Sequence, residues 1–156
     1  MWYKAIITKE KRATLAHFPD CPGCQTQADP GEDILELAQE ALEGWLEAHL
    51  VQDQLPPLPS GKKDKSRARG GVEVEIPVSP SLAVRIQLRV ARHNAGFSQS
   101  TLARKVGVSQ QQIAALESPD ANLTLGTLLR VAKALGLELN IDLSPHSVRR
   151  REIQTA

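Results

Sequence analysis

Three consecutive glutamines, Gln110, Gln111 and Gln112, carry the side chains of this sequence that are best suited to reading DNA. A glutamine amide presents a hydrogen-bond donor beside an acceptor, and this pair can bond the edge of an adenine in the major groove. Gln99 lies at the start of the preceding predicted helix, where it can bond a phosphate together with backbone N–H groups of the helix end. These residue types predict sequence-specific binding to duplex DNA.

Two short helices must position these glutamines, and the surrounding sequence predicts both. Ser98 is a typical N-cap residue, and the helix after it ends at Gly107, where φ can be positive. Ser109 caps the next helix. A short helix, a Gly-Val-Ser turn and a second short helix form a helix-turn-helix, and further helices over residues 81–94 and 123–136 complete an all-helical half.

Residues 96–136 resemble the Cro/C1-type (Xre) helix-turn-helix, with its pattern G-[FL]-S-Q-x-x-L-A-x-x-x-G-V-S, then I-x-x-L-E, then L-x-x-L-x-x-[IV]-A-K-A-L-G. The resemblance implies phosphate contacts for Ser98 and Gln99. It implies base-reading positions for Gln110, Gln111 and Ala115, whose methyl group can touch a thymine methyl. The predicted DNA-binding residues are Ser98, Gln99, Ser109, Gln110, Gln111, Gln112 and Ala115.

The first half of the chain predicts short strands around one amphipathic helix. Three β-prone runs come first, over residues 2–8, 13–18 and 24–28. Apolar residues then recur every three to four positions from Glu32 to about Val51, which predicts a helix with Asp29 as its N-cap and Pro30 in its first turn. Residues 72–78 alternate apolar and acidic side chains. They predict a fourth strand, which either pairs within this sheet or serves as an edge for a partner's strand.

A second resemblance covers this half. The pattern F-P-D-x-P-G-C-x-T-x-x-D runs from Phe18 to Asp29, and Leu58-Pro59-Ser60 follows the predicted helix, as in HicB antitoxins. One departure is Ala28-Asp29-Pro30, where that family usually has Gly-Asp-Thr/Ser. The resemblance implies a partial RNase H-like domain joined to a DNA-binding domain. It also implies a protein that neutralises HicA, a small basic mRNA-cleaving toxin, and represses its own operon.

The charge distribution agrees with two partners of opposite charge. The chain has 19 basic and 18 acidic residues, a net charge of +1, but residues 1–60 carry 4 basic and 10 acidic side chains, which sum to −6. Residues 81–156 carry 10 basic and 5 acidic side chains, which sum to +5. The acidic part suits a basic toxin and the basic part suits DNA phosphates. The predicted toxin-binding residues are Phe18, Asp20, Glu36, Glu40 and Glu43.

We therefore predict an α+β protein with a β-β-β-α-β module followed by an all-helical domain. The predicted boundaries are a toxin-binding domain over residues 1–78 with a Pro-rich and basic connection over 55–71, a helix-turn-helix domain over 79–144, and a flexible basic tail over 145–156. Apolar and polar residues alternate over residues 137–143, which predicts a strand without a partner in its own domain. We expect it to pair across a two-fold axis and form a homodimer, which could assemble further with the toxin.

Composition excludes several classes of protein. No apolar run approaches the roughly 18–20 residues of a membrane span, and the first residues lack a signal-peptide core, so we expect a cytoplasmic protein. Aromatic residues make up 3% of the chain, too few for a base-stacking platform. Cys21-Pro22-Gly23-Cys24 is a lone C-x-x-C pair, which we interpret as incidental thiols. We expect neither a metal nor a cofactor, because no second cysteine pair completes a zinc site.

Two other functions compete with the antitoxin. One is a free-standing transcriptional regulator whose N-terminal domain senses a small ligand. The other is a metal-dependent nuclease that uses the carboxylates of Asp20, Asp29, Asp33, Glu36 and Glu40. We expect no enzyme, because these acids do not form a pattern of separated strand-borne carboxylates and the four histidines are scattered along the chain.

Overall fold

The computed structural model describes residues 1–60, 70–118 and 124–140. The chain divides into two compact units. Among the described residues, the first comprises Met1–Ala48 and the chain from Pro56 to Ser79, and the second comprises His49–Leu55 and the chain from Pro80 to Asn140. In the described residues no helix is both long and apolar enough to cross a membrane.

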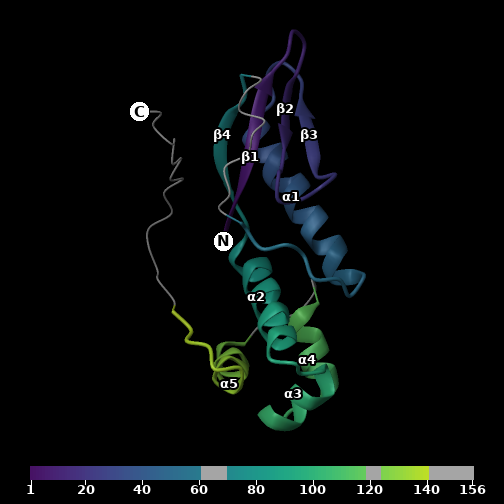
Figure 1. Cartoon of the computed structure of the whole chain (residues 1–156), viewed down its shortest axis with the longest axis vertical. Helices are drawn as coiled ribbons and strands as arrows, with labels where there is room; N and C mark the ends of the chain where they lie inside the picture. Colours follow the sequence, from purple (N-terminus) through teal and green to yellow (C-terminus); the bar gives the residue numbers. More distant parts are fainter. Residues whose placement is uncertain (61–69, 119–123, 141–156) are drawn as a thin grey trace. The chain divides into compact units, whose positions relative to one another are not determined.

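The first unit contains an antiparallel sheet. Its strands are β1 (Trp2–Lys9), β2 (Thr14–His17), β3 (Gln25–Ala28) and β4 (Val72–Pro77). Their order is β3-β2-β1-β4, so the last of the described strands lies beside the first (Figure 1). Strands come first and helices dominate the rest of the chain, which confirms the predicted α+β class. The RNase H-like character of this sheet stays a prediction.

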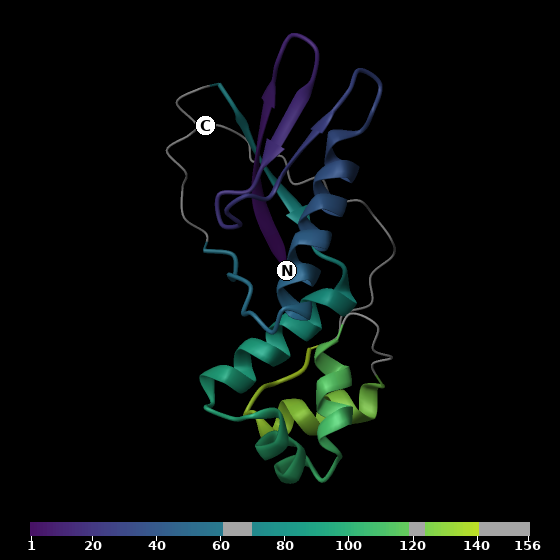
Figure 2. The same ribbon diagram turned by 90° about the vertical axis from the view of Figure 1, so that its right-hand side faces the viewer.

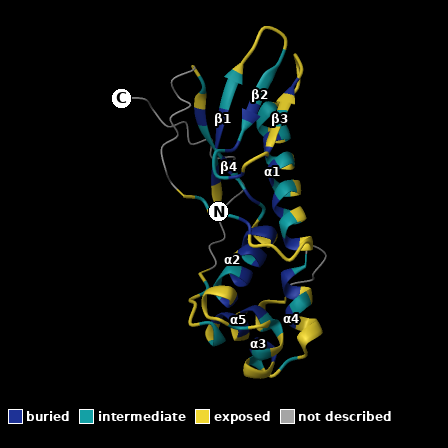
Figure 3. Cartoon of the chain, turned by 45° about the vertical axis from the view of Figure 1, so that its right-hand side comes forward, coloured by how far each residue is buried: buried dark blue, intermediate teal, exposed yellow. Residues whose placement is uncertain are grey.

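One face of the sheet is covered by α1 (Ile34–Val51), which runs alongside the strands (Figure 2). Ala38, Leu42 and Leu46 recur on one side of the helix and are fully buried. Tyr3 and its cross-strand partner Ile76 supply buried side chains from the sheet. Polar residues occupy the turns, and the β1–β2 hairpin end is exposed (Figure 3).

The predicted start of this helix is wrong by about one turn. α1 begins at Ile34, and the Oδ1 atom of Asp33 accepts a hydrogen bond of 2.8 Å from the backbone N–H of Leu35. Asp33 therefore acts as the N-cap in place of Asp29. The backbone N–H of Asp29 instead donates to the Glu32 carboxylate at 2.8 Å, which keeps residues 29–32 in a turn.

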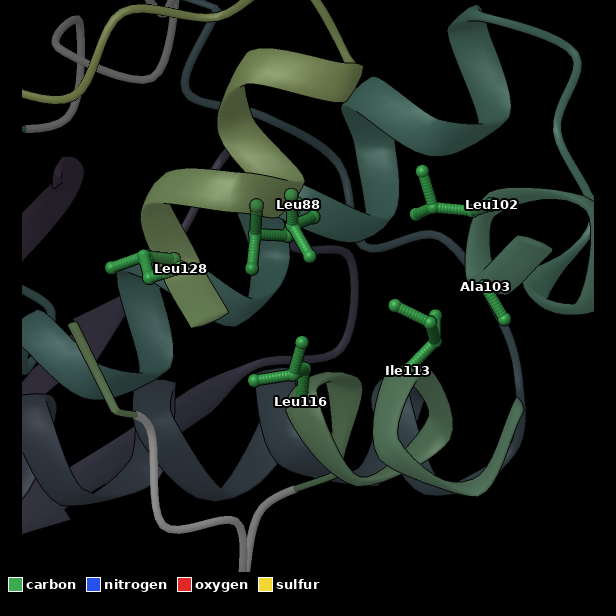
Figure 4. Close-up of a cluster of buried hydrophobic side chains, with 7 residues drawn as sticks. Leu88, Leu102, Ala103, Ile113, Leu116 and Leu128 are labelled. Atoms are coloured by element: carbon green, nitrogen blue, oxygen red, sulfur yellow. The ribbon is translucent and has the colours of Figure 1, made fainter. Parts of the chain in front are cut away.

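Four helices of the second unit enclose a separate core (Figure 4). They are α2 (Pro80–Asn94), α3 (Gln99–Val106), α4 (Gln110–Glu117) and α5 (Leu125–Ala134). The buried residues of this core are Leu88, Leu102, Ala103, Ile113, Leu116, Leu128 and Val131. Because the small side chain of Ala103 allows close approach, α3 and α4 pack against each other as a helix-turn-helix, as predicted.

The predicted dimerisation strand begins within the described part of the chain. Residues 137–140 form no strand there, and Leu139 packs against the core of the helical unit. The remainder of that strand and the predicted tail over 145–156 lie outside the described residues. A strand needs a second strand for its backbone hydrogen bonds, so pairing across a two-fold axis stays a prediction.

Candidate nucleic-acid interface

The N-terminus of α4 is held by a reciprocal pair of hydrogen bonds. The Ser109 hydroxyl accepts from the backbone N–H of Gln112 at 3.1 Å, and the Gln112 side chain accepts from the backbone N–H of Ser109 at 2.9 Å. This capping box uses the Gln112 side-chain oxygen within the helix itself. Gln110 and Gln111 are exposed beside it, and Ala115 is exposed one turn later. The start of α4 therefore presents two glutamine amides to the surroundings.

The preceding helix is bounded by the residues that the sequence indicates. The Ser98 hydroxyl accepts from the backbone N–H of Thr101 at 3.0 Å and caps α3. Gly107 ends the helix with φ of 74°, a left-handed conformation that favours glycine. Ser98 is exposed, whereas Gln99 is half-buried. These local signals set the length of α3 and the turn that leads into α4.

Gln99 has a partner inside the protein that the sequence analysis missed. Its side-chain Nε2 donates to Oε2 of Glu117 at 3.2 Å. The same carboxylate accepts from Arg92 Nε at 2.6 Å and Arg92 Nη2 at 2.8 Å, and Arg89 Nε lies 3.4 Å away. Arg92 Nη1 also donates to the carbonyl of Phe97 at 2.8 Å, in the loop before α3. A buried charge cluster thus connects α2, α3 and α4.

Electrostatics in this cluster keep Glu117 ionised. Burial by itself would raise the pKa of Glu117, but hydrogen bonds from Arg92 and Gln99 and the charges of Arg92 and Arg89 outweigh it and lower the pKa. The hydrogen bond to Glu117 in turn raises the pKa of Arg92, against the opposing effect of burial. The sequence contains a signal for this cluster, because Arg85 and Arg89 lie on the same face of α2 as the apolar residues Leu82 and Ile86. Arginines on an apolar face require a buried counter-charge.

Arg89 also binds the segment that enters the helical unit from α1. Its Nη1 donates to the carbonyl of Leu50 at 2.8 Å, and its Nη2 lies 3.2 Å from Oδ1 of Asp53. The last carbonyls of a helix lack partners within that helix, and an arginine can satisfy them. Residues 49–55 therefore belong to the helical unit, to which the hydrogen bond and the ion pair of Arg89 attach them.

The structure places the predicted toxin-binding residues in two groups. Phe18 is buried, with 2% of its surface exposed, and contributes to the core of the first unit. The Asp20 carboxylate accepts from the backbone N–H of Ser60 at 2.9 Å and from its hydroxyl at 2.6 Å. Glu43 accepts from the backbone N–H of Ser79 at 2.7 Å. These three therefore have structural partners, whereas the remaining two, Glu36 and Glu40, are exposed on α1.

The two cysteines are buried and unpaired. Burial raises the pKa of the Cys21 thiol to about 12, with further contributions from Cys24 and Asp20. Burial also raises the pKa of Cys24 to about 11, and its Sγ lies 3.6 Å from the carbonyl oxygen of Ala41. Both thiols are therefore protonated at neutral pH. In the described residues, no group of three or more His, Cys, Asp or Glu side chains is arranged to hold a metal ion.

Comparisons with known proteins agree with both halves of this arrangement. Residues 3–111 match the HicB-like antitoxin family of bacterial toxin–antitoxin systems, and residues 88–141 match the helix-turn-helix family. Antitoxin HicB 1 of Photorhabdus laumondii is 27% identical over 134 residues, which cover 86% of this chain and 81% of that protein. Antitoxin HicB of Escherichia coli is 28% identical over 127 residues, which cover 81% of this chain and 87% of that protein.

A solved structure described as a HicA3 and HicB3 toxin-antitoxin complex contains a similar chain. It is 30% identical, with a TM-score of 0.41, and the match covers 51% of this chain and 100% of the other. The family match extends from the first strand into α4 and so includes most of the sequence. This chain belongs to the HicB-like antitoxin family of bacterial toxin–antitoxin systems.

Proposed function

We propose that this chain neutralises a HicA-like mRNA-cleaving toxin through its first unit and represses its own operon through its helix-turn-helix. One observation carries the proposal. The chain combines a HicB-like sequence with a helix, α4, whose capped N-terminus exposes Gln110 and Gln111. An exposed pair of amides at the start of the second helix of a helix-turn-helix suits base reading in the major groove.

Toxin binding is assigned to residues 1–78. The net charge of −6 over residues 1–60 favours a basic partner, and the exposed carboxylates of Glu36 and Glu40 on α1 contribute to that attraction. The antitoxin acts by covering the toxin and carries out no reaction itself. Both the mRNA-cleaving toxin and the operator are in the cytoplasm, which places the antitoxin there.

Operator binding is assigned to α3 and α4. Gln110, Gln111 and Ala115 face the bases, and Ser98 and Gln99 lie against the phosphates. The bond from Gln99 to Glu117 occupies one N–H of its amide, and the second N–H is available to a phosphate oxygen. Two chains joined through the C-terminal part bind half-sites about 34–36 Å apart.

Two assays on the full-length chain test this function. A small basic reading frame of under about a hundred codons should lie beside the gene, and its product should arrest growth unless this chain is co-expressed. The chain should also protect a site upstream of its own operon in footprinting. A variant with Gln110→Ala and Gln111→Ala should still prevent growth arrest but lose the footprint.

Each alternative function has its own outcome in these assays. An intact footprint with no toxin captured and no neighbouring basic frame would favour a ligand-sensing regulator. Nuclease activity that depends on Mg²⁺ or Mn²⁺ and disappears in Asp20→Asn would show an enzyme instead. Ser60→Ala controls for folding, because it removes the hydroxyl bond to Asp20 and keeps the Asp20 carboxylate.

A further inference from the structure

The outer strand β4 pairs with β1 without interruption. Six residue pairs, from Trp2 with Pro77 to Ile7 with Val72, follow one register and contain no bulge. The described strands end at β4 in the sheet order, so none of them bonds to its other side (Figure 1). In an antiparallel ladder alternate residues direct their N–H and C=O groups to either side. β4 therefore presents a row of backbone donors and acceptors along its outer edge.

The two edges of this sheet differ in their protection against strand addition. Edge strands are commonly protected by short length, bulges, proline, a covering segment or charged side chains, of which lysine is the most frequent. At the other edge, β3 has four residues, and its Gln25 and Gln27 are exposed. β4 has six residues, no bulge and no lysine, and its single proline is the last residue. Among the described residues, β4 is therefore the longer and more regular edge, and its charged side chains are all acidic.

Side chains on β4 determine which strand it accepts. Glu73 and Glu75 lie on the sheet face opposite Tyr3 and Ala5, because the side chains of a strand alternate between faces and Val74 pairs with Ala5. In a continuous antiparallel sheet built from two copies of β4, each face keeps its own residues, so glutamates of one copy oppose glutamates of the other. Like charges directly opposite each other are destabilising. A second copy is therefore a poor occupant, whereas a strand with Lys or Arg at alternate positions is a good one.

The two glutamates of β4 differ in how accessible they are to a partner strand. Glu73 is buried and forms an ion pair with Lys4 at 2.9 Å. Glu75 is half-exposed, and Val72 at the start of the strand is 63% exposed. A partner strand would thus meet the carboxylate of Glu75 on one face and the apolar side chain of Val72 on the other.

We propose that β4 is the docking edge for an extended basic segment of the toxin, which adds a fifth strand to the sheet. This inference rests on the proposed function and deepens it by naming the surface and the mode of binding. Backbone hydrogen bonds along β4 supply affinity, and a Lys or Arg opposite Glu75 supplies selection for the basic partner. The same edge disfavours association between antitoxin copies.

Hydrogen exchange of the full chain tests the backbone part of the proposal. The probe is a catalytically inactive form of the small basic protein encoded beside this gene. In the free chain one alternate set of β4 amides should exchange fast, and the complex should slow this set by about tenfold or more. Unchanged exchange in a saturated complex would overturn the proposal while leaving neutralisation intact. Slow exchange already in the free chain would mean that the edge is covered by the chain itself, which also overturns it.

Charge variants test the selection by Glu75. Glu75→Lys should raise the Kd for the basic protein by about tenfold, and Glu75→Gln should raise it less. Glu10→Lys is the matched control, because it makes the same charge change at the exposed β1–β2 turn. Unchanged tryptophan fluorescence of Trp2 and Trp45 verifies that the first unit of each variant is folded. Equal weakening by Glu75→Lys and Glu10→Lys would show general attraction and contradict a strand edge. No binding by the unmodified chain would overturn both the inference and the proposed function.

Discussion

Arg92 binds both carboxylate oxygens of Glu117, through Nε at 2.6 Å and Nη2 at 2.8 Å. Both side chains are almost completely buried. Removing a charge from water is costly, and the cost is recovered only when the partner is present and the remaining hydrogen bonds are satisfied. Because Glu117 is the last residue of α4 and Arg92 lies on α2, this pair fixes the end of α4 within its unit.

Replacing Glu117 by alanine should strongly destabilise the helical unit. The change leaves Arg92 and Arg89 buried without their counter-charge, a situation that costs about 3–5 kcal/mol. Urea unfolding followed by far-ultraviolet circular dichroism measures the loss. The chain's two tryptophans, Trp2 and Trp45, are both in the first unit, so their fluorescence provides an internal control. A fluorescence transition shifted as far as the helical one would contradict a local effect.

The same carboxylate should make the helical unit sensitive to acid. The folded-state pKa of Glu117 lies below its usual value of about 4.3, so its contribution is complete above that pH and is lost as the pH falls through the folded pKa. Unfolding free energies of the helical unit should therefore begin to fall once the pH drops below about 4.3. Glu117→Gln removes the titrating group and should flatten this decline. A decline of the same size in Glu117→Gln would assign the acid sensitivity to other carboxylates.

Neighbouring glutamines of α4 should have different effects on DNA binding. Gln110→Ala should weaken operator binding by about 1–3 kcal/mol and leave binding to random duplexes nearly unchanged. Gln112→Ala should instead destabilise the helical unit by about 1 kcal/mol, because its side chain closes the capping box with Ser109. Fluorescence anisotropy on operator and random duplexes, combined with urea unfolding, separates the two effects. A larger loss of operator affinity for Gln112→Ala than for Gln110→Ala would reverse these roles.

Local signals in the sequence were sufficient to predict the helix-turn-helix. Ser98, Gly107 and Ser109 each act on a backbone that lies within a few residues of their own position. The capping role of Gln112 was equally local, since a serine followed three residues later by glutamine is the signature of a capping box. The residue type alone predicts a base reader at Gln112, whereas the side chain closes the cap of α4.

Contacts between distant residues could not be predicted in the same way. Arg92 and Glu117 are separated by 25 positions, and Asp20 and Ser60 by 40. Residues so far apart meet only once the sheet and the helices have packed. Sequence patterns indicate that Arg92 needs a partner of opposite charge and that Asp20 belongs to a motif. They do not indicate which residue forms the hydrogen bonds with each of these side chains. This is why Asp20 was predicted to bind the toxin, whereas the structure gives it a partner within the same unit.

The contact between Asp20 and Ser60 should stabilise the first unit measurably. Ser60→Ala removes the hydroxyl bond to the Asp20 carboxylate and keeps the backbone N–H bond, so a double-mutant cycle of Asp20→Ala with Ser60→Ala should report a coupling free energy of about 1 kcal/mol for the hydroxyl bond alone. Urea unfolding followed by tryptophan fluorescence supplies the four free energies. Glu10→Ala combined with Ser60→Ala is the control pair and should be additive. A coupling free energy near zero would mean that solvent competes successfully for this carboxylate.

The buried thiols should be inert in the folded chain and should weaken it at high pH. With a pKa of about 12 for Cys21 and about 11 for Cys24, iodoacetamide at pH 8 should label the native chain at least about a hundredfold more slowly than the urea-unfolded chain. Since both values lie above the usual value of about 8.5, the thiols stabilise the first unit below that pH and lose this contribution as the pH rises toward 11.

A double variant with Cys21→Ala and Cys24→Ala isolates this alkaline effect. It leaves every other ionisable side chain unchanged, so only the thiol contribution differs between the two proteins. Tryptophan fluorescence in urea should show that the unmodified chain loses stability more steeply between pH 8.5 and 11. Parallel pH profiles, or equal labelling rates in the native and unfolded chains, would show that water reaches the sulfur atoms and that burial does not control their ionisation.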